Sequence, residues 1–224
     1  MAYSITGIVN LALLKIGVKR ISSHPDSTTP QGIDANDCWE YIRDEVLAKR
    51  DWKFAKTRVA LAQNATAPAY LYDYAYTLPS DFLRLCLTKK DDTNTYPSGA
   101  YDNNYYVTQD GIVVFGTVYS YSIETLSDGT MVLMTNYDNT DYDLYIPYIK
   151  KVTDATKYSP LFIKALSYRL AAELAMPRTE GQKKFESMML MYEKALQEAD
   201  ELNSSMEYVE DETGPYISWA DAGR

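Results

Sequence analysis

Histidine and cysteine, the side chains that most often catalyse reactions or bind metals, are scarce in this sequence. The 224 residues include one histidine, His24, and two cysteines, Cys38 and Cys86. His24 lies in the stretch SSHPDSTTP, which predicts a loop, and a lone histidine in such a loop is more often a surface residue than a general base. Two isolated thiols indicate a reducing compartment and provide neither a disulfide framework nor a metal cluster.

The known short motifs of catalytic chemistry are absent from the sequence. It contains no phosphate-binding loop, no dinucleotide fingerprint, no nucleophile elbow and no zinc-protease pattern. Aspartate and glutamate are plentiful, but no spacing singles out a pair for acid–base catalysis, so a carboxylate-based hydrolase is a disfavoured alternative. We therefore predict that the protein is not an enzyme and uses no cofactor or metal.

The composition is that of a folded chain with an acidic balance. Hydrophobic residues make up 46% and charged residues 24%, and 22 Lys+Arg against 31 Asp+Glu give a formal net charge of −9. This balance argues against a protein that grips duplex DNA, because nonspecific affinity for DNA comes from lysine and arginine. No apolar run approaches the ~20 residues of a membrane-spanning helix, and the N-terminus does not resemble a secretory signal, so no membrane partner is predicted.

Two helices are predicted before residue 58. Ser4 can cap the first, whose apolar residues recur every three or four positions up to Ile16, and Gly17 can adopt the positive φ that often ends a helix. The second helix begins near Pro30 and ends at about Arg50. Its predicted apolar face, with Arg43 and Asp44 turned outward, consists of Ile33, Ala35, Cys38, Trp39, Ile42, Val46 and Leu47.

The middle of the chain, residues 59–151, is dominated by short β-prone runs between turn signals. This pattern predicts an antiparallel sheet or partial barrel rather than βαβ units. Trp52 and Phe54 follow the second helix, and we predict that they form the structural junction between helices and sheet.

The phrase YTLPSDFLRL within this region predicts a turn around Pro79. Proline and the two polar residues that follow it favour a turn whose outside is polar. Leu78, Phe82 and Leu85 are then expected to be buried, which makes Pro79 and Phe82 part of the predicted structural junction.

Two more helices are predicted at the end of the chain. Ser159 and Pro160 can cap the third, and Thr179 with Gln182 forms a capping box for the fourth, which loses its periodicity after Asn203. The predicted fold is α+β. It consists of a bundle of four helices (residues 1–58 and 152–203), a β-rich insertion (59–151) and an extended acidic C-terminal arm (204–224).

The C-terminal arm combines acidic residues with late apolar ones. Residues 195–224 carry a net charge of −7, yet Tyr216, Ile217 and Trp219 follow a helix-incompatible Gly-Pro pair near the end. A solvated, disordered tail would explain the charge alone. Apolar anchors with flanking charges favour a segment that becomes ordered on a partner, so we predict that these three residues bind a partner protein or a neighbouring subunit.

Tyrosine is unusually frequent, with 21 residues, of which 14 lie between Tyr70 and Tyr148. Tyrosine is favoured in binding interfaces, but it also has a high strand propensity and can simply occupy exposed sheet positions. Stacking of single-stranded bases is disfavoured, because the same region has many aspartates and few basic residues.

Three stretches together carry a resemblance to a known family. They are NLALLKIG at 10–17, the second helix with its exit WKFAKTR at 52–58, and YTLPSDFLRL at 76–85. In this combination and order, the chain resembles the head-to-tail adaptor proteins of short-tailed bacteriophages, often called tail tubular protein A. The tyrosine- and aspartate-rich insertion and the arm depart from the better-known members.

The resemblance implies a structural virion protein located in the tail and assembled in the host cytoplasm. Its members form homo-oligomeric rings, usually dodecamers, between the portal protein of the capsid and the tail nozzle protein, and genome DNA passes through the lumen without specific binding. An acidic lumen would let the duplex slide. The alternative is a tyrosine-rich tail module that recognises a receptor or carbohydrate, for which the helices are only an attachment.

Overall fold

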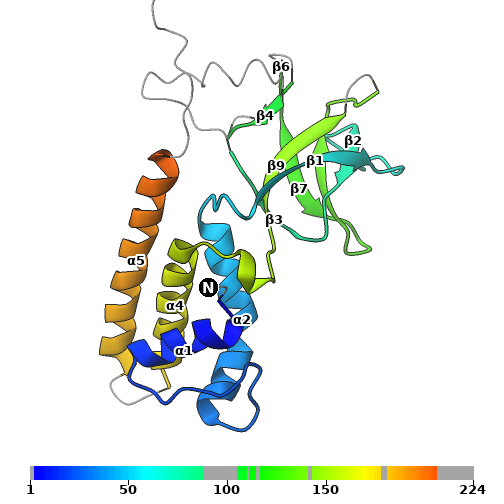
Figure 1. The fold of residues 1–224 in the computed structure, drawn as a ribbon. Coiled ribbons are helices and arrows are strands. Elements are labelled where there is room, and N and C mark those ends of the chain that lie inside the picture. Colours follow the sequence, from blue (N-terminus) through cyan, green and yellow to red (C-terminus); the bar gives the residue numbers. More distant parts are fainter. Residues whose placement is uncertain are drawn as a thin grey trace, which may run out of the picture. The chain divides into compact units, whose positions relative to one another are not determined.

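The computed structural model describes residues 3–87, 105–109, 111–114, 117–140, 143–177 and 181–205. In this part of the chain four α-helices and a curled antiparallel sheet of six strands, together with a second sheet of three strands, make up an α+β fold (Figure 1). The predicted α+β class and the β-rich middle are therefore confirmed. Residues 206–224, which hold Tyr216, Ile217 and Trp219, lie outside the described residues.

The helices begin and end where local signals predict. Helix α1 (Ile5–Lys15) is capped by Ser4, whose Oγ accepts a hydrogen bond from the Gly7 amide at 3.1 Å, and is followed by Gly17 at φ +73°. Helix α2 (Pro30–Lys49) has Pro30 in its first turn, where the missing amide proton costs no hydrogen bond.

The C-terminal helices follow the same rules. Helix α4 (Pro160–Ala175) is capped by Ser159, and a short 3₁₀ helix, η1 (Ala155–Lys157), precedes it. Helix α5 (Gly181–Ser205) extends one residue beyond the predicted start of the arm at 204. Thr179 of the predicted capping box lies outside the described residues.

The nine strands formed by the described residues are short and antiparallel. The six-stranded sheet has the order β3-β9-β1-β2-β8-β7, and the three-stranded sheet has the order β4-β5-β6. In chain order they are β1 (Lys56–Gln63), β2 (Tyr74–Thr77), β3 (Phe82–Leu85), β4 (Tyr105–Val107), β5 (Ile112–Val114), β6 (Thr117–Tyr119), β7 (Tyr121–Thr125), β8 (Met131–Thr135) and β9 (Leu144–Lys150). Although β2 and β3 are separated by one turn, β2 pairs with β1 and β8, whereas β3 pairs with β9.

The chain divides into two compact units. The first contains residues 1–58, 79–86 and 147–206, and the second contains 59–78, 87–146 and 207–224. Residues 79–86 and 147–151 thus belong with the helices, although they lie within the predicted insertion. The reason is backbone pairing, because β3 pairs with the end of β9 and the Lys150 amide donates to the Ala55 carbonyl oxygen at 2.9 Å.

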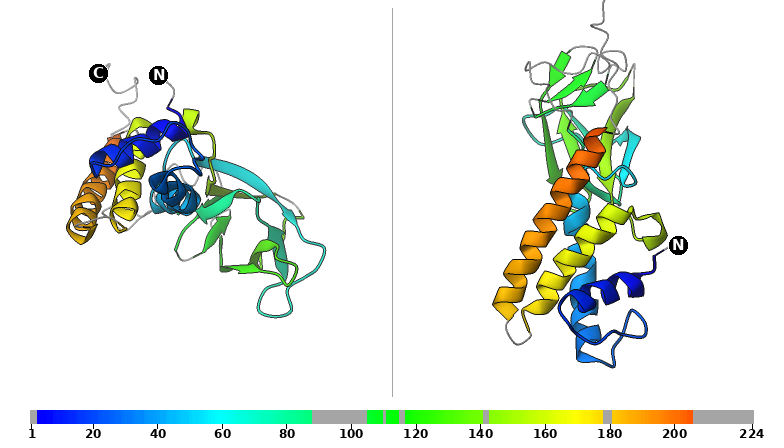
Figure 2. Two further views of the ribbon diagram at one scale, coloured as in Figure 1. Left: turned by 90° about the horizontal axis from the view of Figure 1, so that it is seen from below. Right: turned by 60° about the vertical axis from the view of Figure 1, so that its left-hand side comes forward.

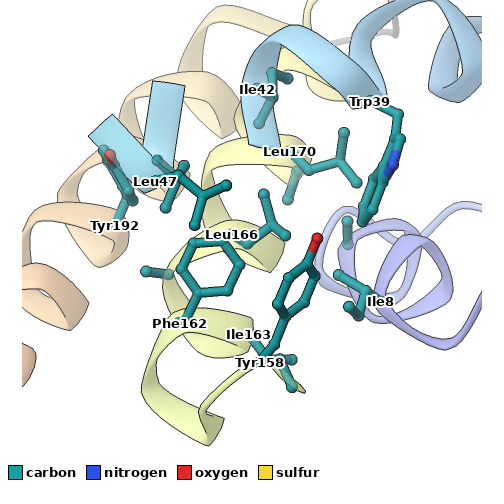
Figure 3. Close-up of a cluster of buried hydrophobic side chains, with 14 of the residues drawn as sticks. Ile8, Trp39, Ile42, Leu47, Tyr158, Phe162, Ile163, Leu166, Leu170 and Tyr192 are labelled. Atoms are coloured by element: carbon teal, nitrogen blue, oxygen red, sulfur yellow. The ribbon is translucent and has the colours of Figure 1, made fainter. Parts of the chain in front are cut away.

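The core of the first unit is built around α4, which packs against α1, α2 and α5. Both views of Figure 2 show α4 and α5 side by side. Figure 3 shows side chains of α4, Phe162, Leu166 and Leu170 among them, lying with Leu47 and Ile42 of α2. Each of these five side chains is fully buried.

Two predictions for α2 are wrong. Arg43, predicted to point outward, is 3% exposed, whereas Ile33, predicted to be buried, is 45% exposed. Arg43 lies four residues from both Trp39 and Leu47, so helical spacing places it on the buried stripe. Ile33 instead shares an exposed line with Tyr41, two turns further along the helix.

Candidate interaction surfaces

The predicted junction residues Trp52 and Phe54 belong to an aromatic cluster in the first unit. Trp52 is 2% exposed, and its Nε1 donates to the Val46 carbonyl oxygen at 2.8 Å. Phe162 lies at the centre of this aromatic cluster. Its ring centroid is 5.1 Å from that of Trp52, 5.1 Å from that of Phe54 and 4.8 Å from that of Tyr158. The large interplanar angles are those of favourable edge-to-face packing, so the cluster stabilises the fold where the chain leaves α2.

The turn at Pro79 forms as predicted, but Phe82 is only half-buried. The Phe82 amide donates to the Pro79 carbonyl oxygen at 3.0 Å, while Leu78 and Leu85 are each 6% exposed. Phe82 stacks on Tyr148, with a centroid distance of 5.8 Å. It lies at the start of β3, the end strand of its sheet, whereas Leu85 at the other end of the same strand is buried.

The turn also holds one polar contact that the sequence did not predict. The hydroxyl of Tyr148 donates to Asp81 Oδ1 at 3.0 Å, which ties β9 to the residues after Pro79. Burial, with the acceptor Asp81, raises the pKa of Tyr148 to about 12, so the phenol stays protonated at neutral pH.

The loop that contains His24 is closely bonded to the helices. The backbone amide of His24 donates to Thr6 Oγ1 at 3.0 Å, and its ring lies 5.5 Å from that of Trp39. Burial lowers the pKa of His24, whose Nδ1 is buried without a hydrogen-bond partner among the described residues. His24 is therefore a packing residue rather than a freely solvated one, which loop composition alone could not indicate.

Asp26 closes the same loop onto the start of α2. Its carboxylate accepts hydrogen bonds from the hydroxyls of Thr28 and Thr29 at 2.6 Å each. These hydrogen bonds, of which the one from Thr28 has the largest effect, lower the pKa of Asp26 to about 2. A Cβ on Gly32 would lie 2.6 Å from the Asp26 side chain, so the close approach of loop and helix requires glycine there.

The groups best suited to chemistry are dispersed or inert. Cys38 and Cys86 are buried free thiols, and burial raises the pKa of Cys38 to about 12, which removes its thiolate at neutral pH. Within the part of the chain that the structure describes, no three His, Cys, Asp or Glu residues are grouped to hold a metal ion. Among the described helices, none combines the length and apolar character needed to cross a bilayer.

Charge is distributed unequally between the two units. The first unit contains 19 basic and 16 acidic residues, whereas the second contains 3 basic and 15 acidic residues. Almost all positive charge therefore belongs to the helical unit, and the β-rich unit with the C-terminal residues carries the acidic excess. The sequence by itself indicates the acidic arm but not this division, because residues 79–86 and 147–206 join residues 1–58 only in the folded chain.

Eight basic residues gather where α2 leads into β1, and we call them the basic cluster. Three segments meet here, because Arg84 Nε donates to the Ala48 carbonyl oxygen and the Lys150 amide to that of Ala55. The basic cluster consists of Lys49, Arg50, Lys53, Lys56, Arg58, Arg84, Lys150 and Lys151.

Arg50, Arg84 and Lys151 of the basic cluster form ion pairs with described acidic residues. Arg50 Nε lies 2.8 Å from Asp200 Oδ2 of α5, Lys151 Nζ lies 3.0 Å from Asp44 Oδ2, and Arg84 pairs with Asp51. Lys49 and Arg58 are exposed, and the described residues include no ion pair for either one. The surface of the basic cluster is therefore suited to an acidic partner.

Among the described residues of the second unit, the large apolar side chains with the highest exposed fractions lie in the loop between β1 and β2. Tyr70 and Leu71 are 73% and 77% exposed, and Leu71 has a φ of +69°. A leucine with positive φ is strained, which is a feature more often found at binding loops than at neutral turns.

No protein-family model matches this chain, and no curated protein matches it either.

Proposed function

We propose that this chain is a structural protein of a bacteriophage virion, a head-to-tail adaptor that joins the portal protein to the tail nozzle protein. In this proposal it is not an enzyme and needs no cofactor. It assembles in the host cytoplasm into a homo-oligomeric ring, of twelve copies as in the family it resembles, and genome DNA passes through the ring without specific binding.

One observation carries the proposal: the stretches of the resemblance form defining parts of the structure. Residues 10–17 include the last turns of α1 and its glycine end, and residues 52–58 form the turn from α2 into β1. Residues 76–85 form the end of β2, the turn and β3. The three stretches therefore lie at a helix end and at strand connections, and this placement is what supports the proposal.

The charge distribution is consistent with the same proposal. A closed ring needs two different, complementary patches on every copy, since cyclic interfaces are heterologous when there are more than two copies. The helical unit has a basic excess and the β-rich unit an acidic one, so the chain presents surfaces of both signs. In this proposal the four helices form the body of each subunit and the C-terminal arm extends to a neighbour or to the portal.

Electron microscopy of the purified chain mixed with the portal protein of the same phage tests the proposal. We expect class averages to show a ring on one end of the portal, with the same rotational symmetry as the portal or a simple match to it. A chain that stays monomeric on and off the portal would contradict the adaptor function.

The second candidate is a receptor- or carbohydrate-binding tail module, which the exposed loop residues Tyr70 and Leu71 favour. Aromatic side chains on sheet loops are suited to stacking on sugar rings. A glycan array would distinguish this function. Binding that is lost in Tyr70→Ala, by a chain that forms no ring, would favour the receptor module over the adaptor.

A further inference from the structure

We propose that strand β7 is a docking edge, at which an extended basic segment of a partner protein adds a seventh strand to the six-stranded sheet. This interaction goes beyond the adaptor function, because it requires no ring and its test requires no portal. Three features of β7 support it: its outward-facing backbone groups, the apolar row of side chains that ends on it, and the negative charge around it.

The first feature is the position of β7 in its sheet. It is the end strand, and in the described part of the chain it pairs with β8 alone. Its five residues, YSIET, include neither proline nor lysine, which commonly protect an exposed strand edge. The backbone of β7 is therefore suited to pairing with an added strand.

The register of the β7–β8 hairpin identifies the backbone groups that an added strand would use. The hairpin turn closes with a hydrogen bond from the Leu126 amide to the Thr130 carbonyl oxygen at 2.8 Å. Hydrogen-bonded and non-hydrogen-bonded pairs alternate along an antiparallel ladder, so Glu124 and Ser122 are the residues bonded to β8. The residues whose amides and carbonyls point away from β8 are therefore Tyr121, Ile123 and Thr125.

The second feature is a row of apolar side chains that crosses three strands and ends on β7. Tyr76 of β2 lies opposite Leu133 of β8, which lies opposite Ile123 of β7. Tyr76 and Leu133 are fully buried, whereas Ile123 is 37% exposed. Directly opposite residues share one face of a sheet, so an apolar residue paired with Ile123 would extend the row and cover its exposed end.

The third feature, charge, determines the kind of partner. Within the described part of the second unit every charged residue is acidic, and these residues are Asp73, Glu124, Asp128, Asp138 and Asp143. Glu124 is exposed on β7 itself, where Ser122 Oγ donates to its Oε1 at 3.0 Å, and Asp128 lies in the turn that ends the strand.

This charge favours a lysine or arginine opposite Glu124, because cross-strand pairs of opposite charge are stabilising. A second copy of this acidic unit would bring further negative charge to the edge. So would residues 207–224, which contain five acidic residues and one basic residue. The occupant that the edge selects is therefore a basic strand of another protein.

A synthetic peptide, KTKVTVK with blocked ends, serves as the probe for the full chain. In antiparallel pairing its central valine lies opposite Ile123 and its third residue, lysine, lies opposite Glu124. The matched control peptide has the same sequence and charge but carries an N-methyl group on the central valine, which removes one backbone donor. We expect the control to bind at least ~10-fold more weakly in fluorescence anisotropy, because the main-chain hydrogen bonds supply the affinity. Equal binding of the two peptides, or no binding of either, would overturn the proposal.

Amide hydrogen exchange of the ¹⁵N-labelled chain locates the contact. Saturating peptide should slow exchange at Tyr121, Ile123 and Thr125 by at least ~10-fold, and change it less at Ser122 and Glu124, which are already bonded to β8. Binding that leaves the three outward amides unchanged would overturn the proposal. So would slow exchange at these amides without peptide, since the edge would then be covered within the chain itself.

A charge-reversal variant tests the choice of a basic partner. Glu124→Lys should bind the peptide ~10-fold more weakly than wild type, and a peptide with glutamate as its third residue, KTEVTVK, should recover binding to this variant. The matched control, Glu201→Lys on the exposed side of α5, makes the same charge change in the helical unit and should bind like wild type. An equal loss of binding in both variants would show that net charge alone attracts the peptide, and would overturn the assignment to β7.

Discussion

Replacing Phe162 by alanine is expected to destabilise the helical unit more than any other single aromatic truncation in it. The Phe162 side chain is 0% exposed and contacts three aromatic rings. Truncation of a fully buried phenylalanine costs about 3–5 kcal/mol, and the loss of three edge-to-face contacts places this site near the upper end, at about 4–5 kcal/mol.

Phe82→Ala provides the matched comparison. Phe82 is half-buried and has one stacked ring, that of Tyr148, so its truncation should cost only about 1–2 kcal/mol. Phe162→Leu keeps most of the buried volume and should cost less than ~2 kcal/mol.

Urea unfolding followed by tryptophan fluorescence measures these differences, because Trp52 lies in the same cluster as Phe162. With a slope of ~2 kcal/mol per molar urea, Phe162→Ala should lower the midpoint by about 2 M, and Phe82→Ala by less than ~1 M. A Phe162→Ala midpoint within ~0.5 M of the Phe82→Ala midpoint would refute the packing argument.

Three further predictions concern pH, a buried charge and the C-terminal arm. Because burial lowers the pKa of His24, the unfolded chain binds a proton more readily than the folded chain, so the free energy of unfolding should fall as the pH drops below ~6.5. His24→Gln should flatten this pH dependence between about pH 7.5 and 5.5. Equal slopes of stability against pH in the variant and the wild type would contradict the prediction. Arg43→Met should change the free energy of unfolding little in thermal unfolding, because Nη2 of Arg43 is buried without a partner among the described residues. Asp44→Ala should cost about 2 kcal/mol, because it leaves the buried guanidinium of Arg43 without its counterion. A larger loss of stability in Arg43→Met than in Asp44→Ala would show that the ion pair itself stabilises the fold. Deleting residues 206–224 should leave the far-ultraviolet circular dichroism spectrum and the melting temperature nearly unchanged but weaken attachment to the portal. Truncated protein that attaches as well as the full chain would contradict a role of the C-terminal arm in assembly.

Local signals in the sequence were sufficient to predict the helices and strands. The caps at Ser4 and Ser159, the first-turn prolines and Gly17 act within one helical turn, so the beginnings of α1, α2 and α4 could be predicted within a residue or two. The alternation of β-prone runs and turns likewise predicted the strands, because strand formation and turn geometry depend on neighbouring residues.

Tertiary structure alone decided which segments meet. The strands β2 and β3 are adjacent in sequence but pair with different partners, because pairing depends on the whole sheet and not on the turn between them. Arg43 was predicted to point outward because its side chain is charged, whereas its helical spacing from Trp39 and Leu47 places it on the buried face of α2. The basic cluster could not be predicted for the same reason. Its members come from residues 49–58, 84 and 150–151, and long-range hydrogen bonds, from the Arg84 side chain to Ala48 and from the Lys150 amide to Ala55, bring those segments together.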